Sequence, residues 1–157
     1  MREVYDFELM SFAFSLNRIS RVNERFHMAV QDRSAALLGA RKTSAEYHVI
    51  LSLLTSEGEV LSPTQLCDYT LQTASGMTKT LKRLENDGLI QRVESVEDAR
   101  FSMVKLTATG RKLAQKLMKV TLSSYKDIFK NFSPKQFSSM VDLLRLIRKT
   151  LEESFAA

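Results

Sequence analysis

Little in this chain of 157 residues would interrupt a helix, because it contains only two prolines and five glycines. No Pro/Gly/Ser-rich linker or low-complexity segment is visible. Four of the glycines stand where the hydrophobic pattern changes, so they mark the ends of elements. These are Gly39, Gly58, Gly88 and Gly110. The scarcity of helix breakers predicts a mainly helical fold.

A single cysteine, Cys67, excludes an intramolecular disulfide framework and is typical of a reducing compartment. We expect it to be a buried structural thiol in a helix. The N-terminus carries acidic residues and no continuous apolar core, so no signal peptide is predicted. No stretch approaches the ~20 apolar residues of a membrane span. The sequence therefore predicts a cytoplasmic protein with no membrane partner.

Groups that carry catalysis or bind metals are equally scarce. The chain has two histidines, His27 and His48, and no Gly-rich phosphate loop. Neither a nucleophile with its base nor a set of metal ligands can be recognised from the spacing. We therefore predict no enzyme, no metal site and no cofactor.

The charge balance is moderately positive, with 23 Lys and Arg against 18 Asp and Glu, a formal net charge of +5. Such an excess favours an anionic partner such as nucleic acid, but a well-solvated surface is the simpler explanation. Hydrophobic residues make up 44% and charged residues 26%, which is ordinary for a soluble domain. Charge alone does not decide the function.

Long amphipathic helices are predicted at both ends of the chain. Apolar residues recur at steps of three and four over residues 6–38, as on one face of a helix. They are Leu9, Phe12, Leu16, Ile19, Val22, Phe26 and Val30. A helix begins near Ala108, and another opens with a Ser-Pro-Lys-Gln capping box at Ser133. The apolar stripe of the last helix, through Leu144 and Ile147, is typical of a helix packed along another helix.

The centre of the chain predicts a helix-turn-helix. A helix capped by Ser44 is followed by a Ser-Pro-Thr-Gln capping box, in which Ser62 and Gln65 can satisfy free amides. That short helix is followed by a three-residue turn. Thr73 can then cap a helix that runs to residue 87, with Gly88 as its C′ residue.

This last helix has one apolar face, formed by Met77, Leu81 and Leu84. At about 100° per residue, the opposite face is polar and basic. It carries Ser75, Lys79, Lys82 and Asn86, flanked by Thr78 and Arg83. Hydroxyls and cations in this order suit a helix that enters the DNA major groove. An ordinary amphipathic surface helix would show the same pattern.

A β-hairpin is predicted next, from strands at residues 91–94 and 101–106 joined by a polar turn. Arg92 lies on its first strand and Arg100 at its tip. A basic residue on a projecting hairpin can reach a narrow minor groove. The alternative is a surface hairpin with a local ion pair between Asp98 and Arg100.

The segment from Leu66 to Arg92 resembles the MarR family of bacterial regulators. The most specific parts are Arg-Leu-Glu at 83–85, Gly-Leu-Ile at 88–90 and Asp-x-Arg at 98–100. The Val-Lys-Leu-Thr run at 104–107 with Gly110, and Phe-Ser-Pro at 132–134, also look like the family. The resemblance implies a homodimer whose terminal helices interlock, with a winged helix-turn-helix on each flank.

The resemblance also implies which residues contact DNA. The contacts of the recognition helix fall on Thr73, Ala74, Ser75, Thr78, Lys79 and Arg83. The minor-groove arginine is Arg100, with Asp98 orienting the wing. We add Lys82 from the helical geometry. Two departures are Thr-Leu-Gln at the turn 70–72, and Ala99 in place of a second wing arginine.

Many members of the family are released from DNA by a small, often aromatic, anionic effector bound between the dimer helices and the DNA-binding lobe. The candidate residues here are Phe26, His27, Arg41, Tyr47 and His48. Each also has an ordinary explanation as a core or core-edge residue, and the sequence names no ligand.

We therefore predict a mainly α fold with a small β-hairpin wing in one MarR-like domain. Residues 44–107 are expected to form the winged helix-turn-helix DNA-binding lobe, and residues 1–40 and 108–157 the dimerisation helices. The predicted function is that of a ligand-responsive repressor, which binds a pseudo-palindromic operator in double-stranded DNA as a homodimer. The alternative is a helical interaction module without DNA binding, which leaves the short turn and the basic hairpin unexplained.

Overall fold

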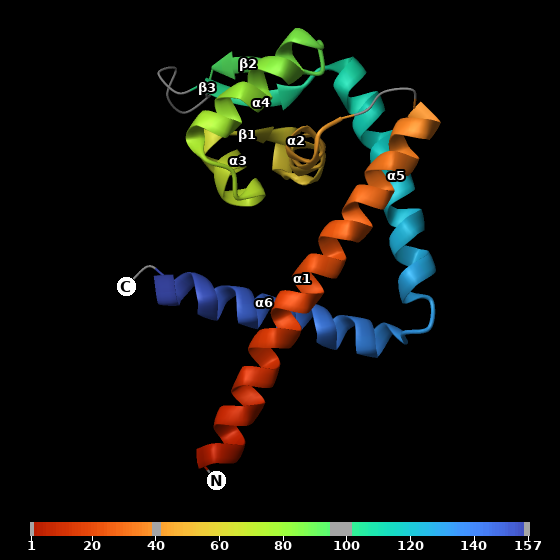
Figure 1. Ribbon diagram of the computed structural model, residues 1–157. Coiled ribbons are helices and arrows are strands. Elements are labelled where there is room, and N and C mark those ends of the chain that lie inside the picture. Colours follow the sequence, from red (N-terminus) through yellow and green to blue (C-terminus); the bar gives the residue numbers. More distant parts are fainter. Residues whose placement is uncertain (1, 39–41, 95–101, 156–157) are drawn as a thin grey trace. The chain divides into compact units, whose positions relative to one another are not determined.

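The computed structural model describes residues 2–38, 42–94 and 102–155 (Figure 1). Within these ranges it contains six α-helices, a short 3-10 turn and one three-stranded sheet. The prediction of a mainly helical fold with a β-hairpin is confirmed. The chain divides into two compact units, residues 1–120 and residues 121–157, and the boundary falls inside helix α5.

The first two helices are α1 (Arg2–Leu38) and α2 (Ser44–Thr55). The prediction of Ser44 as the N-cap of α2 is wrong, because Thr43 is the capping residue. Its hydroxyl accepts from the Glu46 amide at 3.3 Å, and the Glu46 carboxylate accepts from the Thr43 amide at 2.8 Å. Only a cap at Thr43 puts an acid at the third helical position, which closes the box. Ser44 instead accepts a hydrogen bond from Gln31 at 3.0 Å.

The helix-turn-helix consists of α3 (Pro63–Thr70) and α4 (Ala74–Asn86). The capping box at the start of α3 is confirmed, since the Ser62 hydroxyl accepts from the Gln65 amide at 3.1 Å. The Thr73 cap of α4 is confirmed as well, and its hydroxyl accepts from the Gly76 amide at 3.2 Å. At the other end of α4, Gly88 adopts φ +66°, which favours glycine at this position.

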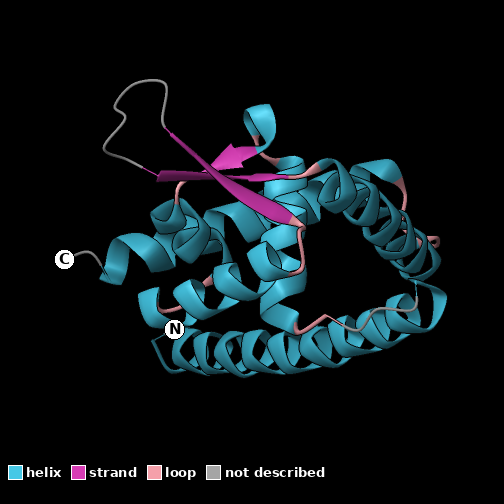
Figure 2. Ribbon diagram, turned by 90° about the horizontal axis from the view of Figure 1, so that it is seen from above, coloured by secondary structure: helices cyan, strands magenta, loops and turns pink. Residues whose placement is uncertain are grey.

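The sheet contains one strand more than the predicted hairpin. A 3-10 turn (Glu57–Glu59) leads into β1 (Val60–Leu61), which pairs antiparallel with β3 (Ser102–Leu106). On its other edge β3 pairs antiparallel with β2 (Ile90–Glu94), and the register places Arg92 opposite Val104. The strands of this sheet are magenta in Figure 2. A two-residue strand is too short to show an alternating pattern, so the sequence did not predict β1. The turn between β2 and β3, with Asp98, Ala99 and Arg100, lies outside the described residues.

The core of the first unit joins the helix-turn-helix to the sheet. Its side chains come mainly from α2, α3, α4 and all three strands, together with Val30 of α1 and two residues of α5. The largest fully buried members are Tyr47, Ile50, Leu53, Leu66, Met77, Leu81, Leu84, Val49 and Val104. Burying one such side chain contributes about 1.5–3 kcal/mol. This core therefore holds α4 in a fixed position on the sheet and α2.

The second unit contains the end of α5 (Ala108–Phe129) and α6 (Pro134–Phe155). The capping box at Ser133 is confirmed, because its amide donates to Gln136 at 2.9 Å and its hydroxyl accepts from the Gln136 amide at 3.3 Å. Phe129 packs edge-on against Phe132 and Phe137, with ring centroids 5.7 and 5.6 Å away. None of the helices in the described part of the chain has the length and hydropathy needed to cross a membrane.

Candidate nucleic-acid interface

Helix α4 has a buried face and a basic exposed face. Met77, Leu81 and Leu84 are at most 1% exposed, as the sequence predicted, and Thr80 joins them at 7%. Every residue that the sequence assigned to DNA on and before this helix is exposed. These are Thr73, Ala74, Ser75, Thr78, Lys79, Lys82 and Arg83. The helix therefore presents one continuous polar surface to solvent.

The cations of this surface are not neutralised by described neighbours. No described acidic side chain forms an ion pair with Lys79, Lys82 or Arg83. The acidic residues at the end of α4 are paired elsewhere: Asp87 with Lys42 at 2.5 Å, and Glu85 with Arg92 at 3.7 Å. The positive charge along α4 is thus available to phosphates.

The start of α4 provides hydroxyls beside the free amides of its first turn. Thr73 uses its hydroxyl oxygen as the cap, and Thr78 donates its hydroxyl proton to the Ala74 carbonyl at 2.9 Å. Ser75 lies 3.4 Å from the Thr73 hydroxyl and is exposed. A helix N-terminus with such groups favours a phosphate or a base edge.

The turn between α3 and α4 is built from residues that the sequence treated as a departure from the family. Leu71 ends α3 in the left-handed conformation with φ +53°. The Gln72 side chain donates to the Thr70 hydroxyl at 3.0 Å and accepts from the Thr80 hydroxyl at 3.0 Å. Gln72 therefore connects the end of α3 to the inner face of α4. Sequence reasoning missed this pair, because no local pattern links residues eight positions apart in different elements.

Four of the five residues proposed for effector binding meet at the junction of α1 and α2. The rings of His27 and His48 are 5.5 Å apart, and Phe26 and Tyr47 flank them at 6.1 and 6.0 Å. Burial lowers the pKa of both imidazoles, and His27 lowers the pKa of His48 further through repulsion between like charges. The fifth candidate, Arg41, lies outside the described residues. Among the residues that the structure describes, no group of three His, Cys, Asp or Glu side chains could hold a metal ion.

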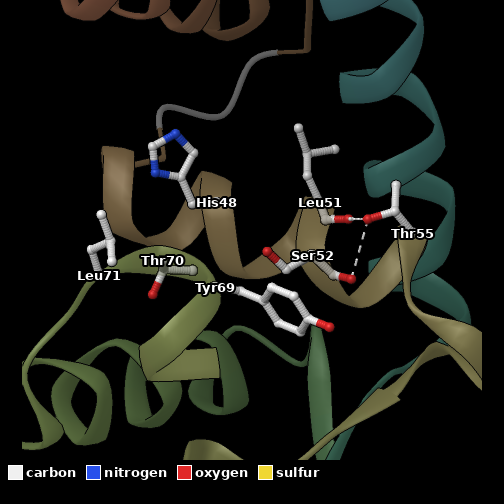
Figure 3. Close-up of a pocket in the computed structure, with 7 residues that line it drawn as sticks. All are labelled: His48, Leu51, Ser52, Thr55, Tyr69, Thr70 and Leu71. Atoms are coloured by element: carbon white, nitrogen blue, oxygen red, sulfur yellow. Dashed lines mark hydrogen bonds between the residues drawn. The ribbon is translucent and has the colours of Figure 1, made fainter. Parts of the chain in front are cut away.

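A cavity of about 340 Å³ lies between α2 and the end of α3 (Figure 3). His48, Leu51, Ser52 and Thr55 line it from α2, and Tyr69, Thr70 and Leu71 from the end of α3. The Thr55 hydroxyl donates to the Leu51 carbonyl at 2.9 Å, so its lone pairs remain for a ligand. The lining combines an aromatic ring and leucines with hydroxyls and one imidazole.

Cys67 is half-buried, so the expectation of a fully buried thiol is wrong. It lies on α3 beside a second cavity of about 290 Å³, whose lining includes Thr78 and Arg92. The small residues Thr64 and Ala74 line the same cavity.

The comparisons with known proteins all point to the same family. Residues 43–100 match the model of the MarR family. The HTH-type transcriptional regulator PrsX of Escherichia coli is 27% identical over 120 residues, which is 76% of this chain and 72% of PrsX. The HTH-type transcriptional repressor IacR of Pseudomonas putida is 26% identical over 103 residues, covering 66% of this chain and 61% of IacR.

The fold is similar to that of solved members of the family. A mutant MarR from E. coli, in complex with operator DNA, superposes with a TM-score of 0.66 at 20% identity, over 83% of this chain and 91% of that one. The relatives are regulators, which agrees with the prediction that the chain is not an enzyme. The matched residues 43–100 include α2, the helix-turn-helix and β2. Residues 43–100 of this chain thus match the MarR family, and the fold of the chain is that of winged helix-turn-helix members of this family.

Proposed function

We propose that this regulator is a homodimeric repressor that binds a pseudo-palindromic operator and releases it when a small ligand binds. The observation that carries the proposal is the exposed basic face of α4, held rigid by a buried apolar face. The DNA contacts would come from Thr73, Ala74, Ser75, Thr78, Lys79, Lys82 and Arg83, with Arg100 in the minor groove and Asp98 orienting the wing. The name of IacR, a transcriptional repressor, supports the direction of regulation.

The dimer is supported by apolar side chains that stay exposed on the terminal helices. On α1, Phe7 is 77% and Phe14 68% exposed, and on α6 Leu144 is 56% exposed. Large exposed apolar surfaces mark interfaces, because soluble monomers rarely leave them in water. We propose that residues 1–40 and 108–157 pair two copies, and that residues 44–107 form the lobe that binds DNA.

Sedimentation of a double variant, Leu144→Asp with Ile147→Asp, tests the dimer. Two carboxylates in the apolar stripe would have to be buried in a dimer, so the variant should sediment as a monomer. Lys135→Asp, on an exposed part of the same helix, is the control and should remain dimeric. A double variant that stays a stable dimer would place the interface elsewhere.

The operator sequence can be obtained by selecting duplexes from a random pool with the wild-type chain. Two recognition helices related by a twofold axis require two inverted half-sites about one helical turn apart. The selected duplex, placed across a promoter in a reporter strain, should lower expression when the chain is present. Selection of single, unrepeated sites, or a rise in expression, would refute this part of the proposal.

We propose that the ligand is a small aromatic anion and that it binds in the cavity between α2 and α3. Its leucines and the Tyr69 ring fit an aromatic body, and the hydroxyls with His48 fit a polar end. Benzoate is the simplest probe of this class. It should weaken operator binding by the wild type and have a smaller effect on Ser52→Leu, which fills the cavity. Equal effects on both proteins, or none on either, would count against this site.

A further inference from the structure

One motif from the sequence takes no part in the DNA-binding face. Residues 106–110, Leu-Thr-Ala-Thr-Gly, connect β3 to the start of α5. Thr107 precedes the first residue of α5, and its hydroxyl accepts a hydrogen bond from the Gly110 amide at 3.0 Å. In this respect it resembles an ordinary helix N-cap.

Thr107 also bonds to the turn that follows α4. Its hydroxyl donates to the Gly88 carbonyl at 2.7 Å, and its amide donates to the Leu89 carbonyl at 3.0 Å. One hydroxyl thus uses its proton on the α4–β2 turn and a lone pair on the first turn of α5. Removing it would break a link between two elements as well as a cap.

Gly110 is the second part of this connection. A Cβ atom at this position would lie 1.8 Å from the Leu89 carbonyl oxygen and 2.8 Å from its carbon. Both neighbouring atoms belong to the backbone, so neither can turn away as a side chain would. The first turn of α5 therefore rests directly on the backbone of Leu89, and only glycine allows this approach.

The α4–β2 turn, which these residues contact, is also hydrogen-bonded to the end of α4, the recognition helix. Gly88 donates its amide to the Glu85 carbonyl at 2.9 Å, and Leu89 donates to the Leu84 carbonyl at 2.9 Å. From the other side, Lys42 in the segment between α1 and α2 forms its ion pair with Asp87, the C-cap of α4. The last turn of α4 is therefore connected both to the start of α5 and to the segment that follows α1.

We propose that Thr107 and Gly110 with Gly88 and Leu89 form a joint through which α5 positions the recognition helix, with Thr107 as the positioning residue. The start of α5 cannot shift against the lobe without breaking these bonds or moving the end of α4. Because α5 continues into the second unit, a change there reaches α4 through this joint. The inference rests on the proposed function only in that α4 is the helix that reads DNA.

The test compares Thr107→Val, which keeps the shape and removes the hydroxyl, with Thr107→Ser, which keeps the hydroxyl. Thr43→Val is the matched control, because it removes the cap of α2. Among the described residues, no hydrogen bond joins α2 to the α4–β2 turn, and the Lys42–Asp87 ion pair is kept in this variant. The readout is the ratio of affinities for the selected operator and for a scrambled duplex of equal length at one salt concentration. A mere loss of folded protein lowers both affinities equally and leaves this ratio unchanged.

Thr107→Val should lower the ratio about 3- to 10-fold, the effect of one or two hydrogen bonds. Thr107→Ser and Thr43→Val should stay within about twofold of the wild type. Hydrogen exchange at the Gly88 and Leu89 amides should be faster in Thr107→Val alone. Should Thr107→Val not fold, Thr107→Ala repeats the comparison.

The proposed joint would be wrong if Thr107→Val showed the same affinity ratio and the same exchange rates as Thr43→Val. A wild type that shows no preference among duplexes would instead refute the proposed function. In that case hydrogen exchange at the Gly88 and Leu89 amides still tests whether the joint exists, because this measurement needs no DNA.

Discussion

The hydroxyl of Thr80 donates a hydrogen bond to the side-chain oxygen of Gln72 at 3.0 Å, which connects the inner face of α4 to the turn after α3. The same hydroxyl lies 3.1 Å from the Gly76 carbonyl, within α4 itself. A residue in the turn is thus bonded directly to the buried face of α4.

Gln72→Ala should lower the free energy of unfolding by about 1 kcal/mol, because it removes two hydrogen bonds of a half-buried side chain and leaves Thr80 with its backbone partner. Urea denaturation measures the change. Gln91→Ala, at an exposed position of β2, is the control and should change stability by less than about 0.5 kcal/mol. Equal losses in the two variants would show that the Gln72 bonds do not stabilise the turn.

The two adjacent candidates for the cap of α2 can be separated by substitution. Thr43→Ala should cost about 1 kcal/mol, because it opens the capping box with Glu46. Ser44→Ala removes only an exposed hydrogen bond from Gln31, and should cost less than about 0.5 kcal/mol. Thermal unfolding followed by circular dichroism compares them, and a larger loss for Ser44→Ala would contradict the structure.

Stability should fall as the pH falls below about 6.5, the ordinary histidine value. Burial lowers the pKa of His27 and His48 in the folded chain, so the unfolded chain binds more protons in this range. Unfolding therefore becomes easier as the solution is acidified. His48→Gln should make the melting temperature less dependent on pH between about 7.5 and 5.5. An unchanged dependence would mean that the His27 and His48 pair does not control it.

If Arg100 enters the minor groove, Arg100→Ala should weaken operator binding, most of all for sites with A·T-rich flanks, where the negative potential is concentrated. The loss can be measured by mobility shift on two operators that differ only in their flanks. Arg145→Ala on α6 is the matched control, since its partner Asp142 lies on the same helix. Equal affinity of Arg100→Ala and the wild type on both operators would remove the wing from the interface.

The sequence predicted those features that depend on neighbouring residues. The capping boxes at Ser62 and Ser133 and the cap at Thr73 could be recognised, because a cap and its partner lie three residues apart. The predicted cap at Ser44 is wrong, since Thr and Ser both cap well and the capping box with Glu46 favours Thr43.

Contacts between distant segments could not be predicted. Strand β1 has two residues and exists because β3 offers an edge. Thr80 shares the helical face of the buried leucines, and its partner Gln72 is visible only in the folded lobe. The Leu-Thr-x-x-Gly motif was recognised through its resemblance to the family, but its contact with Leu89 could be found only in the structure.

We propose that the outward face of α4 binds DNA through its exposed cations. The most direct test of this proposal is the salt dependence of operator affinity for the wild type and for Lys79→Ala with Arg83→Ala. Each lost phosphate contact lowers the slope of log affinity against log salt by about 0.9, so the slope should become shallower by up to about 2. Lys135→Ala with Lys149→Ala on α6 should keep the wild-type slope. A wild-type affinity that salt leaves unchanged, or a slope that the α4 substitutions do not alter, would contradict the account.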